Sequence, residues 1–167
     1  MPKIGYCSHT YVICEYAIAE GVDYMCNNSD IESCRCIAEI LGVINVLQQN
    51  ATCNNDTCLD TCDRGFLGCG VTSFVCNTRP VMLYLCNGTP LSMPTTKDNV
   101  VCGEDGATCS NVFRVEKLDG CCCTFRVLEE NPEGSEFPYS ATNSFFTVNL
   151  NCVCSLRCLS DTHVECI

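Results

Sequence analysis

Cysteine is the residue that most constrains how this chain can fold. The chain has 167 residues, of which 20 are cysteines. This share is typical either of disulfide scaffolds or of proteins that bind metal ions through thiolates. Because 47% of the residues are apolar and the length suits one ordinary domain, we predict a single compact core rather than a disordered chain.

The charge and the first residues indicate where the chain is made and what it does not bind. The net charge is −11, and Lys and Arg form no cluster, so neither nucleic acid nor an anionic membrane is an expected partner. The start lacks the basic and apolar regions of a signal peptide, and no run reaches the ~18 apolar residues of a membrane span. We therefore expect synthesis in a reducing cytoplasm, so that either metal occupies the thiols or oxidation comes later.

One helix is predicted with a clear start and a clear face. Ser29 and Glu32 form a capping box, in which both side chains satisfy free amides of the first turn. Apolar residues then recur at helical spacing through about Gln49. The apolar stripe consists of Ile37, Ile40, Leu41, Ile44 and Leu47. Cys34 and Cys36 lie two residues apart on this helix, so they face different directions and are not expected to pair.

The second half of the chain is predicted to be mainly β, because strand-like runs alternate with Gly, Pro and Asn turn signals. The predicted strands are Val71–Cys76, Val81–Cys86, Val112–Lys117, Cys121–Leu128 and Phe145–Cys158. In the last of them every second residue is apolar or cysteine, so one face should be buried. The cysteines that this alternation places toward the core are Cys152, Cys154 and Cys158.

Together these elements predict an α+β fold that is mainly β: an antiparallel, β-sandwich-like domain with one N-terminal amphipathic helix and a cysteine-rich arm. Residues 1–28, which carry Cys7, Cys14 and Cys26, form the predicted arm. Residues 29–167 form the predicted single domain. Residues 50–70 are rich in Asn, Asp, Thr, Gly and Cys, and we interpret them as a loop held by cross-links rather than by burial.

Three consecutive cysteines, Cys121, Cys122 and Cys123, follow an Asp-Gly turn signal. We predict a three-residue hairpin loop at residues 118–120, because this register puts Val115 opposite Cys123 on an apolar face. A two-residue loop is rejected because it would bring charged side chains onto that face. Cys121 and Cys123 then face the core, whereas Cys122 projects from the polar side. Since a bond between adjacent cysteines would strain the backbone, each should pair farther away.

Metal binding and catalysis find little support in the sequence. The chain has no Cys-x-x-Cys and only two histidines, His9 and His163, so zinc knuckles and the motif of thiol-disulfide exchange enzymes are missing. A catalytic cysteine needs a positioned histidine, and the chain has no Gly-x-Ser-x-Gly and no glycine-rich phosphate loop. We therefore expect a protein that is not an enzyme and that has no cofactor and no structural metal ion.

Two stretches carry a resemblance to a known family. The first is Phe113-Arg-Val-Glu-Lys-Leu118, followed closely by Cys122-Cys123, and the second is Asn151-Cys-Val-Cys-Ser-Leu-Arg-Cys-Leu-Ser160. They resemble the CotY/CotZ/ExsY group of bacterial spore coat and exosporium proteins. A looser likeness extends the resemblance over about residues 34–160. The departures from the family pattern are the cysteines of the arm and the extra Cys76, Cys86, Cys102 and Cys109.

The resemblance implies a structural protein of the spore envelope that self-assembles into a cross-linked, often hexagonal layer. Such a protein is made in the mother-cell cytoplasm, assembles on the spore while reduced and oxidises when that cell lyses, which accounts for a cysteine-rich chain without a signal peptide. The implied partners are other copies of the chain, in a hexamer or lattice, and other spore coat proteins. Two alternatives stay open: a secreted, disulfide-rich, monomeric binding module and a thiolate metal-binding protein.

The cysteines fall into two predicted groups. The candidates for cross-links between subunits, in exposed places, are Cys7, Cys14, Cys26, Cys122 and Cys166. The candidates for disulfides within the core are Cys121, Cys123, Cys152, Cys154 and Cys158. By resemblance, Cys122 and the last four of the core group match family cysteines, which does not decide which of them bond within one subunit.

Overall fold

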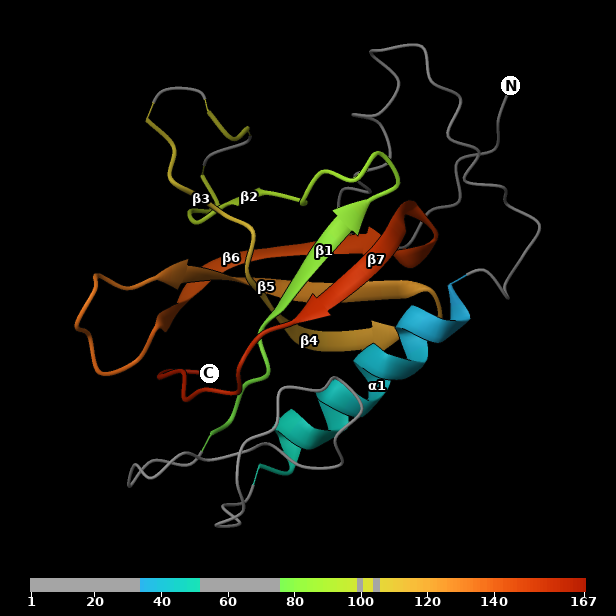
Figure 1. Cartoon of the computed structure of the whole chain (residues 1–167), viewed down its shortest axis with the longest axis horizontal. Helices are drawn as coiled ribbons and strands as arrows, with labels where there is room; N and C mark the ends of the chain where they lie inside the picture. Colours follow the sequence, from blue (N-terminus) through green and yellow to red (C-terminus); the bar gives the residue numbers. More distant parts are fainter. Residues whose placement is uncertain (1–33, 52–75, 99–100, 104–105) are drawn as a thin grey trace.

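The computed structural model describes residues 34–51, 76–98, 101–103 and 106–167. In this part of the chain one α-helix lies against a five-stranded antiparallel sheet, and a two-stranded sheet forms a separate arm (Figure 1). The elements are α1 (Arg35–Gln49), β1 (Val81–Leu85), β2 (Met93–Pro94), β3 (Cys109–Ser110), β4 (Phe113–Asp119), β5 (Cys122–Glu130), β6 (Tyr139–Asn149), the 3-10 helix η2 (Leu150–Cys152) and β7 (Val153–Cys158). The predicted mainly β fold with one helix is confirmed.

Several predictions fall outside the described residues. They are the arm at residues 1–28, the capping box at Ser29 and Glu32, most of the loop at residues 50–70 and, except for Cys76, the strand predicted from Val71. The strands predicted near Val81, Val112 and Cys121 correspond to β1, β4 and β5. The sequence did not predict β2 and β3, which have two residues each, or the polar first half of β6.

The five-stranded sheet curls until its two edge strands come together at one corner. Its order is β6-β5-β4-β1-β7, so β6 and β7 lie at opposite edges, yet only the three residues of η2 connect them. So short a connection requires the end of β6 and the start of β7 to lie close together. Leu150 in η2 also donates its backbone N–H to the carbonyl of Cys121 at 2.8 Å. Figure 1 shows β1 and β7 crossing in front of β4, β5 and β6.

The inner face of the curled sheet and α1 share one hydrophobic core. At its centre the rings of Phe113, Phe125 and Phe146 pack together, with centroids 4.8 to 6.2 Å apart, a spacing at which aromatic pairs attract one another. The side chains that α1 buries against this cluster are Ile37, Leu41 and Ile44. Since each such side chain contributes about 1.5 to 3 kcal/mol when fully buried, these three residues of the predicted stripe contribute strongly to holding α1 on the sheet.

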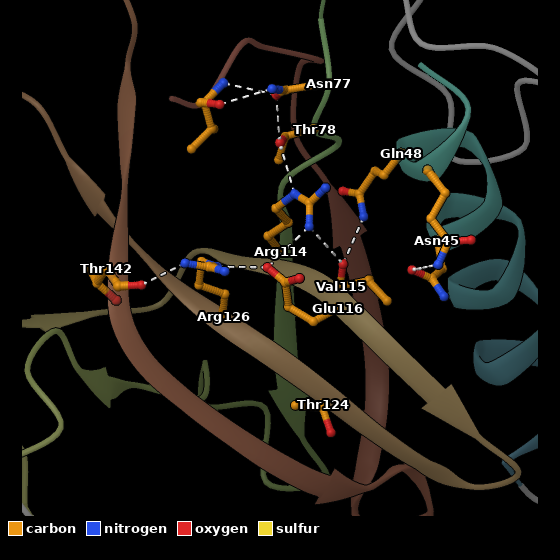
Figure 2. Close-up of polar contacts among 12 residues, drawn as sticks. Asn45, Gln48, Asn77, Thr78, Arg114, Val115, Glu116, Thr124, Arg126 and Thr142 are labelled. Atoms are coloured by element: carbon orange, nitrogen blue, oxygen red, sulfur yellow. Dashed lines mark hydrogen bonds and ion pairs between the residues drawn. The ribbon is translucent and has the colours of Figure 1, made fainter. Parts of the chain in front are cut away.

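Helix α1 spans Arg35–Gln49, and the capping box predicted for its start lies outside the described residues. Its first residue is Arg35, and Cys34 takes the N-cap position without a side-chain hydrogen bond to the helix. Near the other end, Gln48 is 5% exposed. Its side chain donates to the carbonyl of Val115 at 2.9 Å (Figure 2). It also accepts from the N–H of Arg79 at 3.2 Å. The sequence did not reveal this contact, because a glutamine beside an apolar stripe is usually exposed.

The β4–β5 hairpin differs from the prediction in its turn and its register. Asp119 pairs with Cys122, so the turn has two residues rather than three, and Gly120 adopts a positive φ of 57°. The pairing then shifts at a bulge just after Val115, which faces Phe125. We rejected the two-residue loop because it would place charged residues on the apolar face. The bulge removes that conflict, since it adds one residue to β4 and returns the apolar residues to the core side.

The single strand predicted over residues 145–158 is wrong. The chain leaves β6 at Asn149, whose side chain accepts a hydrogen bond from the backbone N–H of Asn151 at 3.0 Å and so starts η2. After this turn Val153 is buried and Cys154, which lies at a bulge in the pairing with β1, is exposed, whereas Leu156 and Cys158 pack against the core as predicted. Cys154 therefore points away from the core, whereas the sequence predicts that it faces the core.

The outer face of the sheet is partly covered by the C-terminal segment, which buried polar contacts hold in place. Arg79 and Asp161 form a two-pronged salt bridge with N···O distances of 2.7 and 2.8 Å. Asn77 donates to the carbonyl of Val164 and accepts from its N–H, each at 2.9 Å. Val164 itself is buried in a small apolar cluster with Leu128. Since a buried salt bridge specifies geometry more than it adds stability, these contacts mainly set the path of residues 159–164.

A charged network crosses β4 and β5 (Figure 2). Glu116, the residue that the bulge adds to β4, accepts from Arg114 at 3.1 Å and from Arg126 at 2.7 Å. Arg114 also donates to the Thr78 hydroxyl and Arg126 to the Thr142 carbonyl, both at 3.1 Å. Burial lowers the pKa of Arg114, and Glu116 opposes that shift. Because no buried side-chain N or O atom of the described residues lacks a partner, this network is explained by its structural role.

Candidate functional site: cysteine cross-links and exposed thiols

Two disulfides join parts of the fold that are far apart in the sequence. The Cys34–Cys121 bond connects the start of α1 to the β4–β5 turn, with a sequence separation of 87 and a Cα–Cα distance of 5.9 Å. The Cys86–Cys154 bond connects the turn after β1 to the edge strand β7, with a separation of 68 and a Cα–Cα distance of 4.9 Å. Both distances suit a disulfide. These bonds hold α1 and β7 on the sheet.

A disulfide of a different kind closes a small loop in the β2–β3 arm. Cys102 and Cys109 are separated by only 7 residues, and their Cα atoms are 5.8 Å apart. Cys109 is exposed and Cys102 is half-buried. The hydroxyl oxygen of Ser92 lies 3.7 Å from the Cys102 sulfur. Since neither cysteine belongs to a hydrophobic cluster of the described residues, this bond constrains the arm alone.

Three further cysteines of the sheet region, Cys122, Cys152 and Cys158, are also disulfide-bonded. Of the five cysteines predicted to form core disulfides, four are therefore bonded: Cys121, Cys152, Cys154 and Cys158. They differ in exposure, because Cys152 is buried, Cys121 and Cys158 are half-buried and Cys154 is exposed. Cys122, which the sequence predicts to bond a neighbouring subunit, is half-buried on the side of β5 away from the core, and its sulfur is already in a bond.

Cys123 is the predicted core-disulfide residue that the structure leaves as a thiol. Its side chain is 0% exposed and packs in the main hydrophobic cluster. Burial raises its pKa from 9.0 to about 12, because an apolar environment disfavours the thiolate. Since the thiolate is the reactive form, Cys123 acts in the folded protein as a small apolar residue.

Two exposed thiols remain in the described part of the chain, Cys36 and Cys166. Cys36 lies in the first turn of α1, outside the buried stripe. Cys166 lies two residues after the buried Val164 and has a φ of 60°. Sequence analysis selected Cys166 but missed Cys36, although the position of Cys36 relative to the apolar stripe is a signal that could have found it. The remaining candidates for links between subunits, Cys7, Cys14 and Cys26, lie outside the described residues.

Exposed apolar side chains accompany both thiols. Val43 and Val46 on α1 are 46% and 57% exposed, and Ile167, next to Cys166, is 43% exposed. Exposed apolar side chains are typical of contact surfaces when they form a contiguous patch. The structure thus places each exposed thiol on an element that also presents apolar surface.

Other kinds of site find little support among the described residues. These residues contain no group of three or more His, Cys, Asp or Glu side chains that could hold a metal ion. No helix among them is long and apolar enough to cross a bilayer. An open hollow beside the β5–β6 loop is lined by Glu130, Asn131 and Tyr139 among others. There, burial and the charge of Glu130 raise the pKa of Tyr139.

A family comparison agrees with the cysteine pattern. The family model described as Spore coat protein Z matches residues 25–161, which is most of the chain. The chain belongs to this spore coat family. The match confirms the resemblance drawn from the sequence and covers every described helix and strand, but it ends before Cys166. No curated protein and no solved structure matches this spore coat protein. Its family and its disulfide-bonded fold support a structural role in the spore coat.

Proposed function

We propose that this spore coat protein assembles with copies of itself into a two-dimensional, disulfide cross-linked layer that protects the spore. The layer forms after synthesis in the mother-cell cytoplasm, first through reversible contacts and then through covalent bonds. Its symmetry is hexagonal, as the family resemblance implies, and other coat proteins adjoin it. The protein acts as building material rather than as an enzyme.

The observation that carries this proposal is the division of cysteines between a closed fold and exposed thiols. Bonds such as Cys34–Cys121 stabilise one subunit, while Cys36 and Cys166 stay exposed and free on two different segments. A protein that used every cysteine for its own fold would leave no sulfur for a neighbour. Disulfides between subunits convert reversible contacts into contacts that only a reductant breaks.

The number of intersubunit disulfides that each copy can form determines whether the assembly is a linear chain or a two-dimensional layer. Two linking sites for each copy, Cys36 and Cys166, suffice for linear chains, whereas a two-dimensional layer needs at least three contacts for each copy. The candidates for the further links are the cysteines of the N-terminal segment, Cys7, Cys14 and Cys26. The proposed layer therefore requires that residues 1–28 take part in assembly.

Charge sets the order of events. The chain carries 20 acidic and 9 basic residues, so copies repel one another at long range. The exposed apolar side chains of Val43, Val46 and Ile167 provide short-range attraction, which has to overcome this repulsion. Repulsion thus delays association until copies are concentrated on the spore surface, and covalent bonds then make it permanent.

The test combines non-reducing electrophoresis with electron microscopy of the purified full-length chain after oxidation. We expect a ladder of covalent oligomers that collapses with reductant, together with ordered sheets. The variant Cys36→Ser with Cys166→Ser should shorten the ladder. Cys123→Ala is the matched control, because it also removes a thiol, but a buried one, and should leave the ladder unchanged. A soluble monomer with all its bonds internal would contradict the proposal.

A further inference from the structure

We propose that the Cys102–Cys109 disulfide is an acceptor for cross-linking: an exposed thiol of a second copy, Cys36 or Cys166, attacks Cys109 and displaces Cys102. The inference rests on the proposed self-assembly and specifies its chemistry. Copies are then linked by disulfide exchange, which needs no oxidant at the moment of linking.

The position of this bridge allows it to open while the main hydrophobic core stays packed. Cys109 is exposed in the two-residue strand β3, and Cys102 lies outside every strand. Neither residue contributes to a hydrophobic cluster. Cys34, in contrast, is 2% exposed within the main cluster, so a second protein cannot reach its bond with Cys121 as easily. Exposed disulfides are generally the labile ones.

The Cys86–Cys154 bridge joins two exposed residues, but it differs because paired strands flank it. Next to this bridge, Tyr84 of β1 pairs with Ser155 of β7. If the bridge opened, these strands would still hold the two sulfur atoms side by side, so the original bond would form again. The Cys102–Cys109 bridge has a strand on one side only, which makes the opened form longer-lived.

Ser92 gives the exchange a direction. Its hydroxyl oxygen lies 3.7 Å from the Cys102 sulfur, and because a disulfide sulfur carries no proton, the hydroxyl must be the donor. This hydrogen bond stabilises the negative charge that develops on Cys102 as it leaves. The exposed Cys109 is then the sulfur that is attacked, and Cys102 is the leaving group.

The step balances without any other reactant. The thiol of the second copy loses its proton, its sulfur forms a bond to the Cys109 sulfur, and the Cys102–Cys109 bond breaks with its electron pair on Cys102. Cys102 takes up a proton, so one disulfide is lost, one is formed and nothing is oxidised overall. The released Cys102 competes by attacking Cys109 again. Linking therefore accumulates where assembly holds the incoming thiol beside Cys109 at high effective concentration.

The first test uses limiting reduced glutathione as the probe thiol, on the full-length, oxidised chain without oxygen. Peptide mass spectrometry should find the first glutathione adduct on Cys109 and a new thiol on Cys102. A first adduct on Cys102, or on Cys86 or Cys154, or no adduct before the protein unfolds, would overturn the proposal.

Ser92→Ala tests the direction of the exchange. Loss of the hydrogen bond to Cys102 should slow adduct formation at Cys109 by about fivefold. The rate at the Cys86–Cys154 bridge, measured in the same sample, should not change and serves as the internal control. Equal rates at Cys109 in the variant and the wild type would show that Ser92 does not direct the reaction.

A third experiment separates this inference from the proposed function. Without oxygen, the concentrated wild-type chain should form covalent dimers, and the variant Cys102→Ser with Cys109→Ser should not. With an added oxidant both should form them. Wild-type dimers that appear only with the oxidant would overturn exchange and leave self-assembly standing. If no dimers appear under either condition, both proposals fail.

Discussion

In the curled sheet, the Cys34–Cys121 bond joins two segments that already pack against a cluster of buried side chains. In the β2–β3 arm, by contrast, the Cys102–Cys109 bond joins two residues that lie outside every hydrophobic cluster described. The β2–β3 arm also has other supports: Met93 packs against the main cluster, and the N–H of Thr95 donates to the carbonyl of Thr108 at 3.0 Å.

This difference shows that disulfides serve two purposes in one chain. In the sheet a bond adds to packing, so it is shielded and holds distant segments together. In the β2–β3 arm the bond joins two residues outside the hydrophobic clusters, so it is accessible and can be exchanged while the core stays folded. The predictions below test this contrast between the sheet and the arm.

The largest effect is expected from a charge in the sheet core. Leu150 is 1% exposed in η2, and Leu150→Asp should prevent folding, because a buried charge without a partner costs several kcal/mol. Circular dichroism and thermal unfolding measure this effect. Ser155→Asp on β7 is the control, since Ser155 is exposed. A normally folded Leu150→Asp protein would mean that the η2 corner is not part of the core.

The two kinds of bridge should differ in their contribution to stability. Removing Cys34–Cys121 by paired serine substitutions should lower the free energy of unfolding by about 4 to 5 kcal/mol, and removing Cys102–Cys109 by roughly 2 to 3 kcal/mol, because a longer loop loses more entropy on closure. Denaturant titration of both variants gives the comparison. Equal losses would contradict the distinction between the sheet and the arm.

The buried glutamine should have an intermediate effect. Gln48→Ala removes the side-chain partner of the Arg79 N–H and leaves the carbonyl of Val115 with only the 3.5 Å side-chain contact from Arg114, which should cost about 1 to 3 kcal/mol. The neighbouring exposed residue provides the control, and Gln49→Ala should change the free energy of unfolding by less than about 0.5 kcal/mol. If the two variants were equally stable, α1 would be held by its apolar stripe alone.

The smallest expected effect is the pH dependence that Cys123 contributes to the free energy of unfolding. Its pKa is raised in the folded protein to about 12, so the unfolded chain loses this proton first as the pH rises. The contribution is fully present below the ordinary thiol pKa of 9.0 and falls between there and about 12, by roughly 1 kcal/mol at pH 10. The free energy of unfolding of Cys123→Ala, measured by denaturant titration at several pH values, should lack this decrease between pH 9 and pH 12.

The rate of alkylation reports how accessible each free thiol is in the folded protein. In the native protein at pH 8, iodoacetamide should label Cys36 and Cys166 promptly and Cys123 only after unfolding, since Cys123 is 0% exposed. Peptide mapping measures the order of labelling. Prompt labelling of Cys123 would show that the core opens locally around β5.

Parts of the fold that depend on local periodicity could be predicted from the sequence. The apolar stripe of α1 and the strands β1, β4 and β5 follow from spacings of three to four residues or of two residues. The hairpin register could not be predicted, because a bulge at Glu116 permits a two-residue turn that simple alternation excludes. The η2 corner could not be predicted either, since the alternation of buried residues continues into it although the strand ends.

The sequence by itself determined that this chain is a cysteine-rich, mainly β protein of the spore coat type, because composition, periodicity and family motifs are local properties. Only the tertiary structure decided which cysteines are partners, as in Cys34–Cys121 and Cys86–Cys154, and which stay free, as Cys36, Cys123 and Cys166 do. The physical reason is that a disulfide needs two Cα atoms within about 7 Å. The curl of the sheet and the docking of α1 set those distances between residues far apart in the chain.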